Sequence, residues 1–216
     1  GFRQGATTMS KFKGFIAAAV AVGMAAFILA MPAHADQVDF TNPAFAPAGG
    51  ITSIPVGAAE FCKSHRGECK ANPNAVGAMV LTEARWAELV QINNLVNTAV
   101  TAITDEDYYK VAEYWAYPDD GYGDCEDFAL AKRKALIDAG WSPSTLLVTV
   151  VRETKGTGHA VLMVRTDRGD LVLDNQDGRI LLWNETPYQY LKRQSQADAG
   201  QWVDLVDPRT TFVATK

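Results

Sequence analysis

One stretch decides the fold: Gly123-Asp-Cys-Glu-Asp-Phe-Ala-Leu-Ala-Lys-Arg-Lys-Ala-Leu-Ile-Asp-Ala-Gly-Trp141. Its apolar residues recur at helical spacing, and glycine is common just after a helix ends, as at Gly140. The sequence therefore predicts a helix from Cys125 to near Gly140, with the thiol of Cys125 in its first turn.

The residues after this helix change in character. Apolar, β-branched runs separated by turn residues predict strands at 146–151, 159–166, 170–175 and 179–183. Residues 188–194 are expected to form a short helix, and 202–206 and 211–213 two final strands.

Two helices are predicted before the quoted stretch. Thr82 would cap a helix from 83 to about 101, and Thr104 would cap one from 105 to 115. Asn93, Asn94 and Asn97 are expected on the polar face of the first helix or in contacts from helix to loop. Helices followed by an antiparallel meander indicate the α+β class, with N-terminal helices packed on an antiparallel sheet.

The N-terminal residues predict a secretory signal peptide over 1–35. Lys11 and Lys13 precede an uncharged run from 14 to 30, and Ala33-His34-Ala35 is a cleavage signal. The alternative is a membrane anchor, although the run of about 17 residues is at the short limit for a span. We expect residues 36–60 to be an extended N-terminal segment and 61–216 to be one domain in the periplasm.

The net charge of the chain limits the classes of partner that it can bind. The chain carries 25 acidic and 20 basic residues. Cleavage after residue 35 would remove three basic residues and no acid, which changes the net charge from −5 to −8. Such a chain is a poor candidate for binding nucleic acid or anionic membrane surfaces.

Three cysteines suggest one pair and one free thiol. Cys62 and Cys69 would close a short loop, worth roughly 2.5 kcal/mol by chain entropy. A metal site that includes His65 is the alternative, but it lacks a fourth nearby ligand. Pairing leaves Cys125 free, and a helix N-terminus favours its thiolate form.

A thiol nucleophile needs a base and a group that orients the base. With His65 in the loop between Cys62 and Cys69, His159 is the candidate base by elimination. A two-residue turn at 167–168 would pair Val161 with Asp174 and place Asp174 on the same sheet face as His159. A three-residue turn with a bulge would shift this register by one residue.

The quoted stretch, with Gly-His-Ala-Val-Leu-Met-Val-Arg-Thr-Asp-Arg-Gly-Asp-Leu-Val-Leu-Asp-Asn at 158–175, resembles the bacterial transglutaminase-like cysteine peptidases. The resemblance spans roughly residues 60–205 and implies a papain-like fold. It also implies that Cys125 is the nucleophile, His159 the base and Asp174 the orienting acid. LapG-type periplasmic members release biofilm adhesins. The implied partners are therefore a protein substrate, such as a large surface adhesin, and an inner-membrane regulatory receptor.

The acids beside Cys125 indicate a metal. Asp124, Glu126 and Asp127 would oppose loss of the thiol proton, and a hard divalent cation would relieve this repulsion. The resemblance assigns Ca²⁺ to Asp124 and Glu126, whereas Asp127 could instead cap the helix. All three acids could also be ordinary N-terminal helix carboxylates.

Two other functions fit the same residues. The triad could transfer an acyl group to an amine and cross-link proteins. In the peptidase reaction the N–H of Cys125 and the indole N–H of Trp115 are candidate donors to the oxyanion, unless Trp115 is a core aromatic. Alternatively, the chain could be a non-catalytic, metal-dependent periplasmic binding module. Cys125, His159 and Asp174 together argue against that alternative.

Overall fold

The computed structural model describes residues 40–210. The predicted signal peptide and the predicted strand at 211–213 lie outside these residues. Within them, none of the helices combines the length and the apolar character that crossing a membrane requires.

The quoted stretch forms helix α4, Cys125–Asp138. Gly140 follows with φ +89°, a left-handed conformation that glycine adopts without strain, and this ends the helix as predicted. The apolar stripe of α4 includes Phe128 and Leu136, which are 3% and 0% exposed. The sequence signals for this helix are therefore confirmed.

The main sheet has the strand order β1-β9-β8-β4-β5-β6-β7, and every neighbouring pair is antiparallel. Its strands are β1 (Ala48–Thr52), β4 (Leu146–Arg152), β5 (Gly158–Thr166), β6 (Gly169–Leu173), β7 (Leu181–Leu182), β8 (Gln189–Gln194) and β9 (Trp202–Leu205). Single 3₁₀ turns lie at η1 (Pro143–Thr145), η2 (Trp183–Glu185) and η3 (Pro208–Thr210). The predicted α+β class is confirmed.

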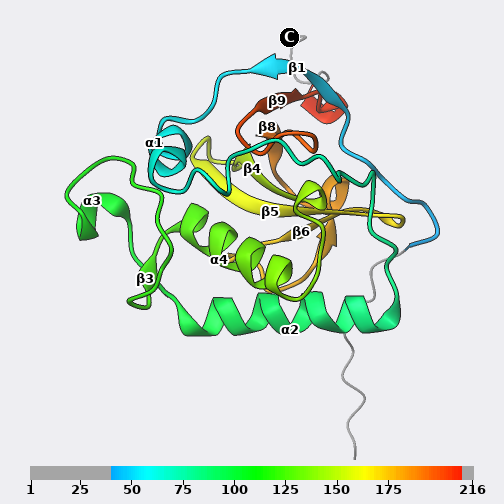
Figure 1. Ribbon diagram of the computed structural model, residues 1–216, viewed down its shortest axis with the longest axis horizontal. Coiled ribbons are helices and arrows are strands. Elements are labelled where there is room, and N and C mark those ends of the chain that lie inside the picture. Colours follow the sequence, from blue (N-terminus) through cyan, green and yellow to red (C-terminus); the bar gives the residue numbers. More distant parts are fainter. Residues whose placement is uncertain (1–39, 211–216) are drawn as a thin grey trace, which may run out of the picture. The chain divides into compact units, whose positions relative to one another are not determined.

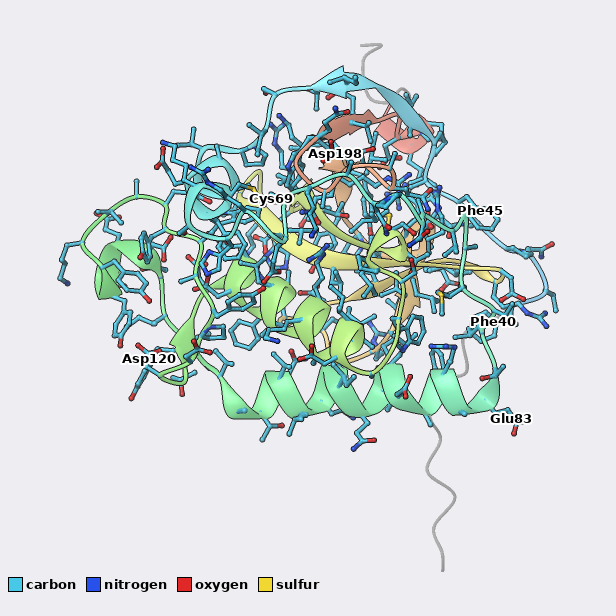
Figure 2. The ribbon with its side chains drawn as sticks, in the orientation of Figure 1. Phe40, Phe45, Cys69, Glu83, Asp120 and Asp198 are labelled. Carbon is cyan, nitrogen blue, oxygen red and sulfur yellow. A yellow bond between two sulfur atoms is a disulfide. The ribbon has the colours of Figure 1, made fainter. Side chains whose placement is uncertain are left out.

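Helix α4 covers one face of the sheet, and α2 (Glu83–Ala99) runs along the far side of α4 (Figure 1). Side chains fill the space between α4 and the strands (Figure 2). One apolar cluster joins α2, α4 and this sheet face. A second cluster includes Met163, Trp183 and Tyr190. It lies on the opposite face of the sheet, because its strand residues alternate with those of the first cluster. The alternating apolar residues of β4 and β5 serve both clusters.

The β5–β6 hairpin has the two-residue turn. Thr166 pairs with Gly169 and Leu162 with Leu173, which is the register of a turn at 167–168. Continued by one step, this register sets Val161 opposite Asp174. The alternative of a bulged three-residue turn is excluded.

A small parallel pairing fixes the entry to α4. Strand β2 (Thr101–Ala102), directly after α2, pairs with β3 (Tyr122–Gly123), directly before Cys125. The N–H of Ile103 donates to the carbonyl of Gly123 at 3.0 Å. The end of α2 and the start of α4 are therefore held together beside Cys125.

Three local predictions were wrong. The helix expected over 188–194 is instead strand β8, Gln189–Gln194, because pairing with β4 and β9 on both sides outweighs the helical propensity of its side chains. The helix expected over 105–115 is only α3, Asp105–Tyr108. It stops because the N–H groups of Tyr114 and Ala116 donate to the carboxylates of Asp105 and Asp127. The strand expected over 179–183 is only β7.

The segment expected to be extended contains regular structure. Strand β1 adds to β9 at the edge of the main sheet, and helix α1 (Val56–Ser64) follows it. The domain was expected to begin after residue 60, but β1 lies before that residue and α1 spans it. Their backbone pairs with or packs on the rest of the fold.

The predicted disulfide is present. Cys62 at the end of α1 is bonded to Cys69, and their Cα atoms are 5.5 Å apart. Beyond Cys69, Ala71 forms a β-bridge with Asp198. Cys69 and Asp198 are labelled in Figure 2. His65 stacks on Phe61 with ring centroids 4.1 Å apart. The metal-site alternative for Cys62 and Cys69 is thereby excluded.

Gly57 is a position where only glycine fits. A Cβ built there would lie 2.2 Å from Cδ1 of Trp115, a buried core ring. We predict that Gly57→Ala lowers the free energy of unfolding by roughly 1–3 kcal/mol in urea denaturation. The substitution should destabilise although alanine favours a helix by about 1 kcal/mol. Gly67→Ala, with no atom within 4 Å of its Cβ, is the control. Equal stability of the two variants would contradict the prediction.

The disulfide also predicts the number of free thiols in the protein. Denatured protein that has not been reduced should show one titratable thiol, that of Cys125, because Cys62 and Cys69 are bonded. Titration with a chromogenic disulfide reagent, before and after reduction, measures this. Three thiols before reduction would rule the pairing out.

Candidate active site

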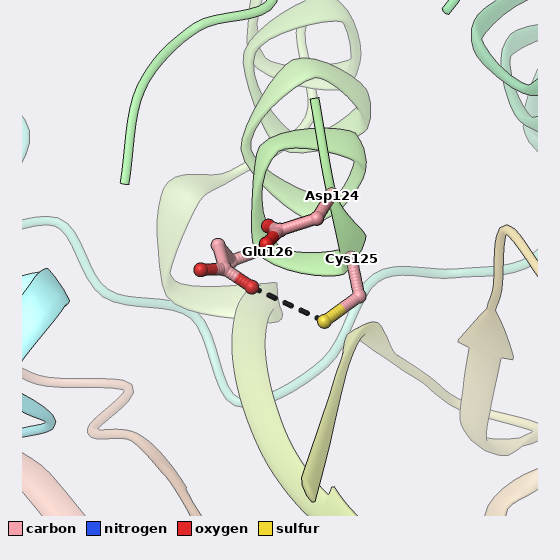
Figure 3. A group of neighbouring side chains, drawn as sticks. All are labelled: Asp124, Cys125 and Glu126. Atoms are coloured by element: carbon pink, nitrogen blue, oxygen red, sulfur yellow. Dashed lines mark hydrogen bonds between the residues drawn. The ribbon is translucent and has the colours of Figure 1, made fainter. Parts of the chain in front are cut away.

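Cys125 lies at the first residue of α4, and its side chain is partly exposed. Its thiol donates to Oε2 of Glu126 at 3.1 Å (Figure 3). The backbone N–H of Ala160, the residue after His159, also hydrogen-bonds to the sulfur. The thiol is therefore bordered by an acid from its own helix and by the strand that carries His159.

The surroundings of Cys125 disfavour its thiolate. Burial raises the pKa of the Cys125 thiol, the charge and hydrogen bond of Glu126 raise it further, and Asp124 adds to the effect. The N–H of Ala160 only partly opposes this. The expected lowering of the pKa at the helix N-terminus is thus overturned while the acids are unneutralised. The opposing effect expected from the neighbouring carboxylates prevails.

His159 is buried near the start of β5. Its Nε2 lies 2.9 Å from Oδ1 of Asp174. An ionised carboxylate only accepts, so this bond places the imidazole proton on Nε2 and leaves Nδ1 with its lone pair. The side-chain amide of Gln176 lies 3.3 Å from that Nδ1. The structure thus brings His159 and Asp174 together and leaves Nδ1 available as a base.

Asp174 follows β6 and is 3% exposed. Its Oδ1 also accepts the N–H of Gln176 at 3.0 Å, and its Oδ2 accepts the hydroxyl of Tyr188. Burial by itself would raise the pKa of Asp174. Hydrogen bonds from His159, Tyr188 and Gln176, with the charge of His159, nevertheless hold this pKa below its ordinary value. The carboxylate is therefore kept ionised.

Helix α2 holds the loop after Asp174. Nδ2 of Asn97 donates to the carbonyl of Asp174 at 2.8 Å, and Nδ2 of Asn93 donates to the carbonyl of Gly178 at 3.1 Å. The sequence predicted either a polar-face position or a contact from helix to loop for these asparagines. Asn93 and Asn97 make the contact from helix to loop. They tie the loop that carries the carboxylate to a helix that is itself tied to α4 by β2 and β3.

Acids crowd the other side of Cys125. Ligand atoms of Asp124, Cys125 and Glu126 lie within 4.8 Å of one another, and so do those of Asp105, Asp124 and Asp127. Oδ1 of Asp124 is buried without a hydrogen-bond partner among residues 40–210. An orphaned carboxylate oxygen in a group of carboxylates is a donor set that suits a hard cation.

Burial and mutual repulsion perturb these acids strongly. Burial, followed by the charge of Asp124, raises the pKa of Glu126 to about 10. Burial raises the pKa of Asp105 to about 6 and that of Asp127 to about 7, with the charge of Asp124 contributing to both. Without a cation Glu126 therefore holds its proton at neutral pH, whereas Asp105 and Asp127 ionise close to neutral pH.

The three acids next to Cys125 differ in their contacts. Asp127 is fully buried and accepts the N–H groups of Ala116 at 2.8 Å and Asp124 at 3.3 Å. This is the capping role that the sequence kept as an alternative for Asp127. Asp124 and Glu126 are the acids whose oxygens lie with the sulfur.

The sequence analysis missed four residues at this site: Asp105, Gln176, Tyr188 and, as a specific partner of Asp174, Asn97. Asp105 had a signal, since it begins a predicted helix in a run of acids. Tyr188 had none, because its segment was assigned to a helix. Trp115 is a core aromatic: it is 6% exposed and donates its indole N–H to Glu113 at 2.9 Å.

These features match a known family. A family model described as bacterial transglutaminase-like cysteine proteinase matches residues 48–210, well over half of the chain. The chain belongs to this family. The family and enzyme class expected from the sequence are thereby confirmed: it is a cysteine peptidase family with a transglutaminase-like fold.

This chain is similar to solved structures of LapG from Legionella pneumophila. The calcium-bound form has 26% identity and a TM-score of 0.48, covering 55% of this chain and 68% of LapG. The EGTA-treated form has the same identity and TM-score, covering 59% and 74%. A third LapG structure has 28% identity and a TM-score of 0.47, covering 55% and 68%. None of the curated proteins matches the chain.

Proposed function

We propose that this family member is a periplasmic cysteine endopeptidase that cleaves a protein substrate with Cys125 as nucleophile, His159 as base and Asp174 as orienting acid. One observation carries the proposal. The hydrogen bond of 2.9 Å from His159 to Asp174 leaves the lone pair on Nδ1 of the imidazole, and the next residue, Ala160, donates its N–H to the sulfur of Cys125. A nucleophile beside an oriented base is the arrangement that acyl transfer requires.

The reaction follows from these positions. Nδ1 of His159 takes the thiol proton, and the sulfur of Cys125 attacks the peptide carbonyl carbon. The imidazolium then gives its proton to the leaving amine as the C–N bond breaks, which leaves a thioester on Cys125. A water molecule, deprotonated by the same nitrogen, attacks the thioester and releases the acid and the thiol. The backbone N–H of Cys125, in the first turn of α4, would stabilise the oxyanion.

The substrate and its place are part of the proposal. The predicted signal peptide and the disulfide both fit an oxidising compartment. By resemblance to LapG-type proteases, the substrate would be a large surface adhesin and the regulator an inner-membrane receptor. The cross-linking alternative differs only in the acceptor, so product analysis with and without an added amine separates the two.

We further propose that the acid group beside Cys125 binds Ca²⁺ through Asp124 and Glu126, with Asp105 as an added ligand. The orphaned oxygen of Asp124 and the mutual repulsion of these carboxylates support this. The ion would supply positive charge that keeps the carboxylates ionised and lowers the cost of the Cys125 thiolate. In this role the ion does not need to contact the substrate.

The proposed nucleophile can be tested in the producing cell. Cell-surface and medium proteins of the wild type should include a fragment that is missing with Cys125→Ser. His159→Ala should lose the same fragment, since nucleophile and base act as a unit. With purified protein the rate should fall on the order of 100-fold or more in each variant. His65→Ala, in the disulfide loop, is the matched control and should keep the fragment. A His159→Ala rate above about a tenth of wild type would overturn the triad.

Calcium can be tested without a substrate. Calcium should raise the melting temperature, since a ligand at a hundredfold excess over its Kd stabilises by about 2.7 kcal/mol. It should also speed alkylation of Cys125 by iodoacetamide at neutral pH, and EGTA should reverse both effects. Magnesium should act more weakly.

The variants Asp124→Asn and Glu126→Gln should lose both calcium responses. Asp119→Asn, which removes an exposed carboxylate from the same acidic region, should keep them. Unchanged melting and alkylation in EGTA, with no calcium by elemental analysis, would remove the metal and leave the triad untouched.

A further inference from the structure

Asp174 receives support from a residue outside the proposed triad. Its Oδ1 is shared by Nε2 of His159 and the N–H of Gln176, at 2.9 Å and 3.0 Å. Its Oδ2 accepts the hydroxyl of Tyr188. Each carboxylate oxygen is thus occupied by donors from a different direction, which fixes the rotation of the carboxylate about its own bond.

Tyr188 also borders the imidazole. Its ring centroid lies 5.4 Å from that of His159, with the ring planes tilted by 56°. The tyrosine is partly buried, and Asp174 is almost fully buried. If the hydroxyl were absent, Oδ2 of a buried carboxylate would lose its recorded donor. Such a loss costs more than the same loss at the surface.

The backbone of Tyr188 is held by the end of the described chain. Nη2 of Arg209 donates to the carbonyl of Tyr188 at 2.7 Å, and Nη1 donates to those of Thr186 and Asn184 at 3.0 and 3.1 Å. The guanidinium also pairs with Asp207 at 2.8 Å. One arginine therefore clamps the whole turn that presents Tyr188 to Asp174.

From these contacts we infer that Tyr188 is a positioning residue of the catalytic unit. Its hydroxyl holds Oδ2 of Asp174 so that Oδ1 stays on Nε2 of His159 and Nδ1 keeps the lone pair that the proposed base needs. The inference rests on the proposed function and adds to it a residue that contacts neither the substrate nor the sulfur. Arg209 secures this residue through the backbone.

Tyr188→Phe tests the inference, because it removes the hydroxyl and keeps the ring. Tyr190→Phe is the matched control. It also loses one hydroxyl hydrogen bond, to Thr186 at 2.9 Å, in the same segment, but its hydroxyl is not bonded to Asp174. The melting temperature measures what each hydroxyl contributes to stability. A loss of activity in Tyr188→Phe that its loss of stability does not explain is then due to the contact with Asp174.

Two readouts follow. On a peptide spanning the cleavage site of the shed fragment, Tyr188→Phe should lower kcat about tenfold with KM changed less than about twofold, as expected for a lost hydrogen bond to a charged group. In ¹⁵N-histidine NMR, the Nε2 proton of His159 should exchange with water faster. Tyr190→Phe should match wild type in both.

Each contrary result is distinct. Wild-type kcat and an unchanged Nε2 proton in Tyr188→Phe would overturn the inference, as would equal loss of kcat in both variants in proportion to their melting temperatures. A Tyr188→Phe protein that does not fold would make the hydroxyl structural and overturn it as well. Failure of the proposed function would show differently: wild-type Cys125 would resist iodoacetamide with calcium present, and no fragment would be shed.

Discussion

The packing of α4 on β5 is the contact on which the site depends. Phe128 and Leu136 of α4 share one apolar cluster with Leu162 and Val164 of β5. Burying each such side chain is worth roughly 1.5–3 kcal/mol, so sliding the helix along the strand would cost several of these contributions at once. The core thereby sets the sulfur against the N–H of Ala160, on the strand that carries His159.

The same packing makes charge expensive near the sulfur. At another buried site the charge is paired: Arg165 binds Asp170, which is 0% exposed, at 2.7 Å. The acids at the start of α4 are grouped only with one another. Lys132 of the same helix is buried too, and burial lowers its pKa to about 7, although the charge of Asp174 opposes this. The site therefore combines a secure frame with an unbalanced charge, which is the physical basis for expecting a cation.

Local signals were sufficient where one segment carries the whole pattern. The helix at Cys125, the caps Thr82 and Thr104 and the Asp167-Arg168 turn could all be predicted, because spacing and turn chemistry act over a few residues. The turn register in turn allowed Asp174 to be placed near His159. Residues 188–194 could not be assigned, because β4 and β9 decide their conformation from far along the chain. Tyr188 and Asp105 went unnoticed for the same reason, since each acts on a partner from a separate element.

The disulfide has a consequence for the order of oxidation. Cys62 and Cys69 are consecutive cysteines, separated by seven positions, and both precede Cys125. In the proposed export to an oxidising compartment, a chain that enters N-terminus first exposes this pair before the third thiol has emerged. A local pair closes a short loop quickly, whereas a bond to Cys125 must span a much longer one. Early closure removes the two sulfurs that could capture Cys125 in a mixed bridge, so the third thiol can reach the folded state unpaired without an isomerase to rescue it.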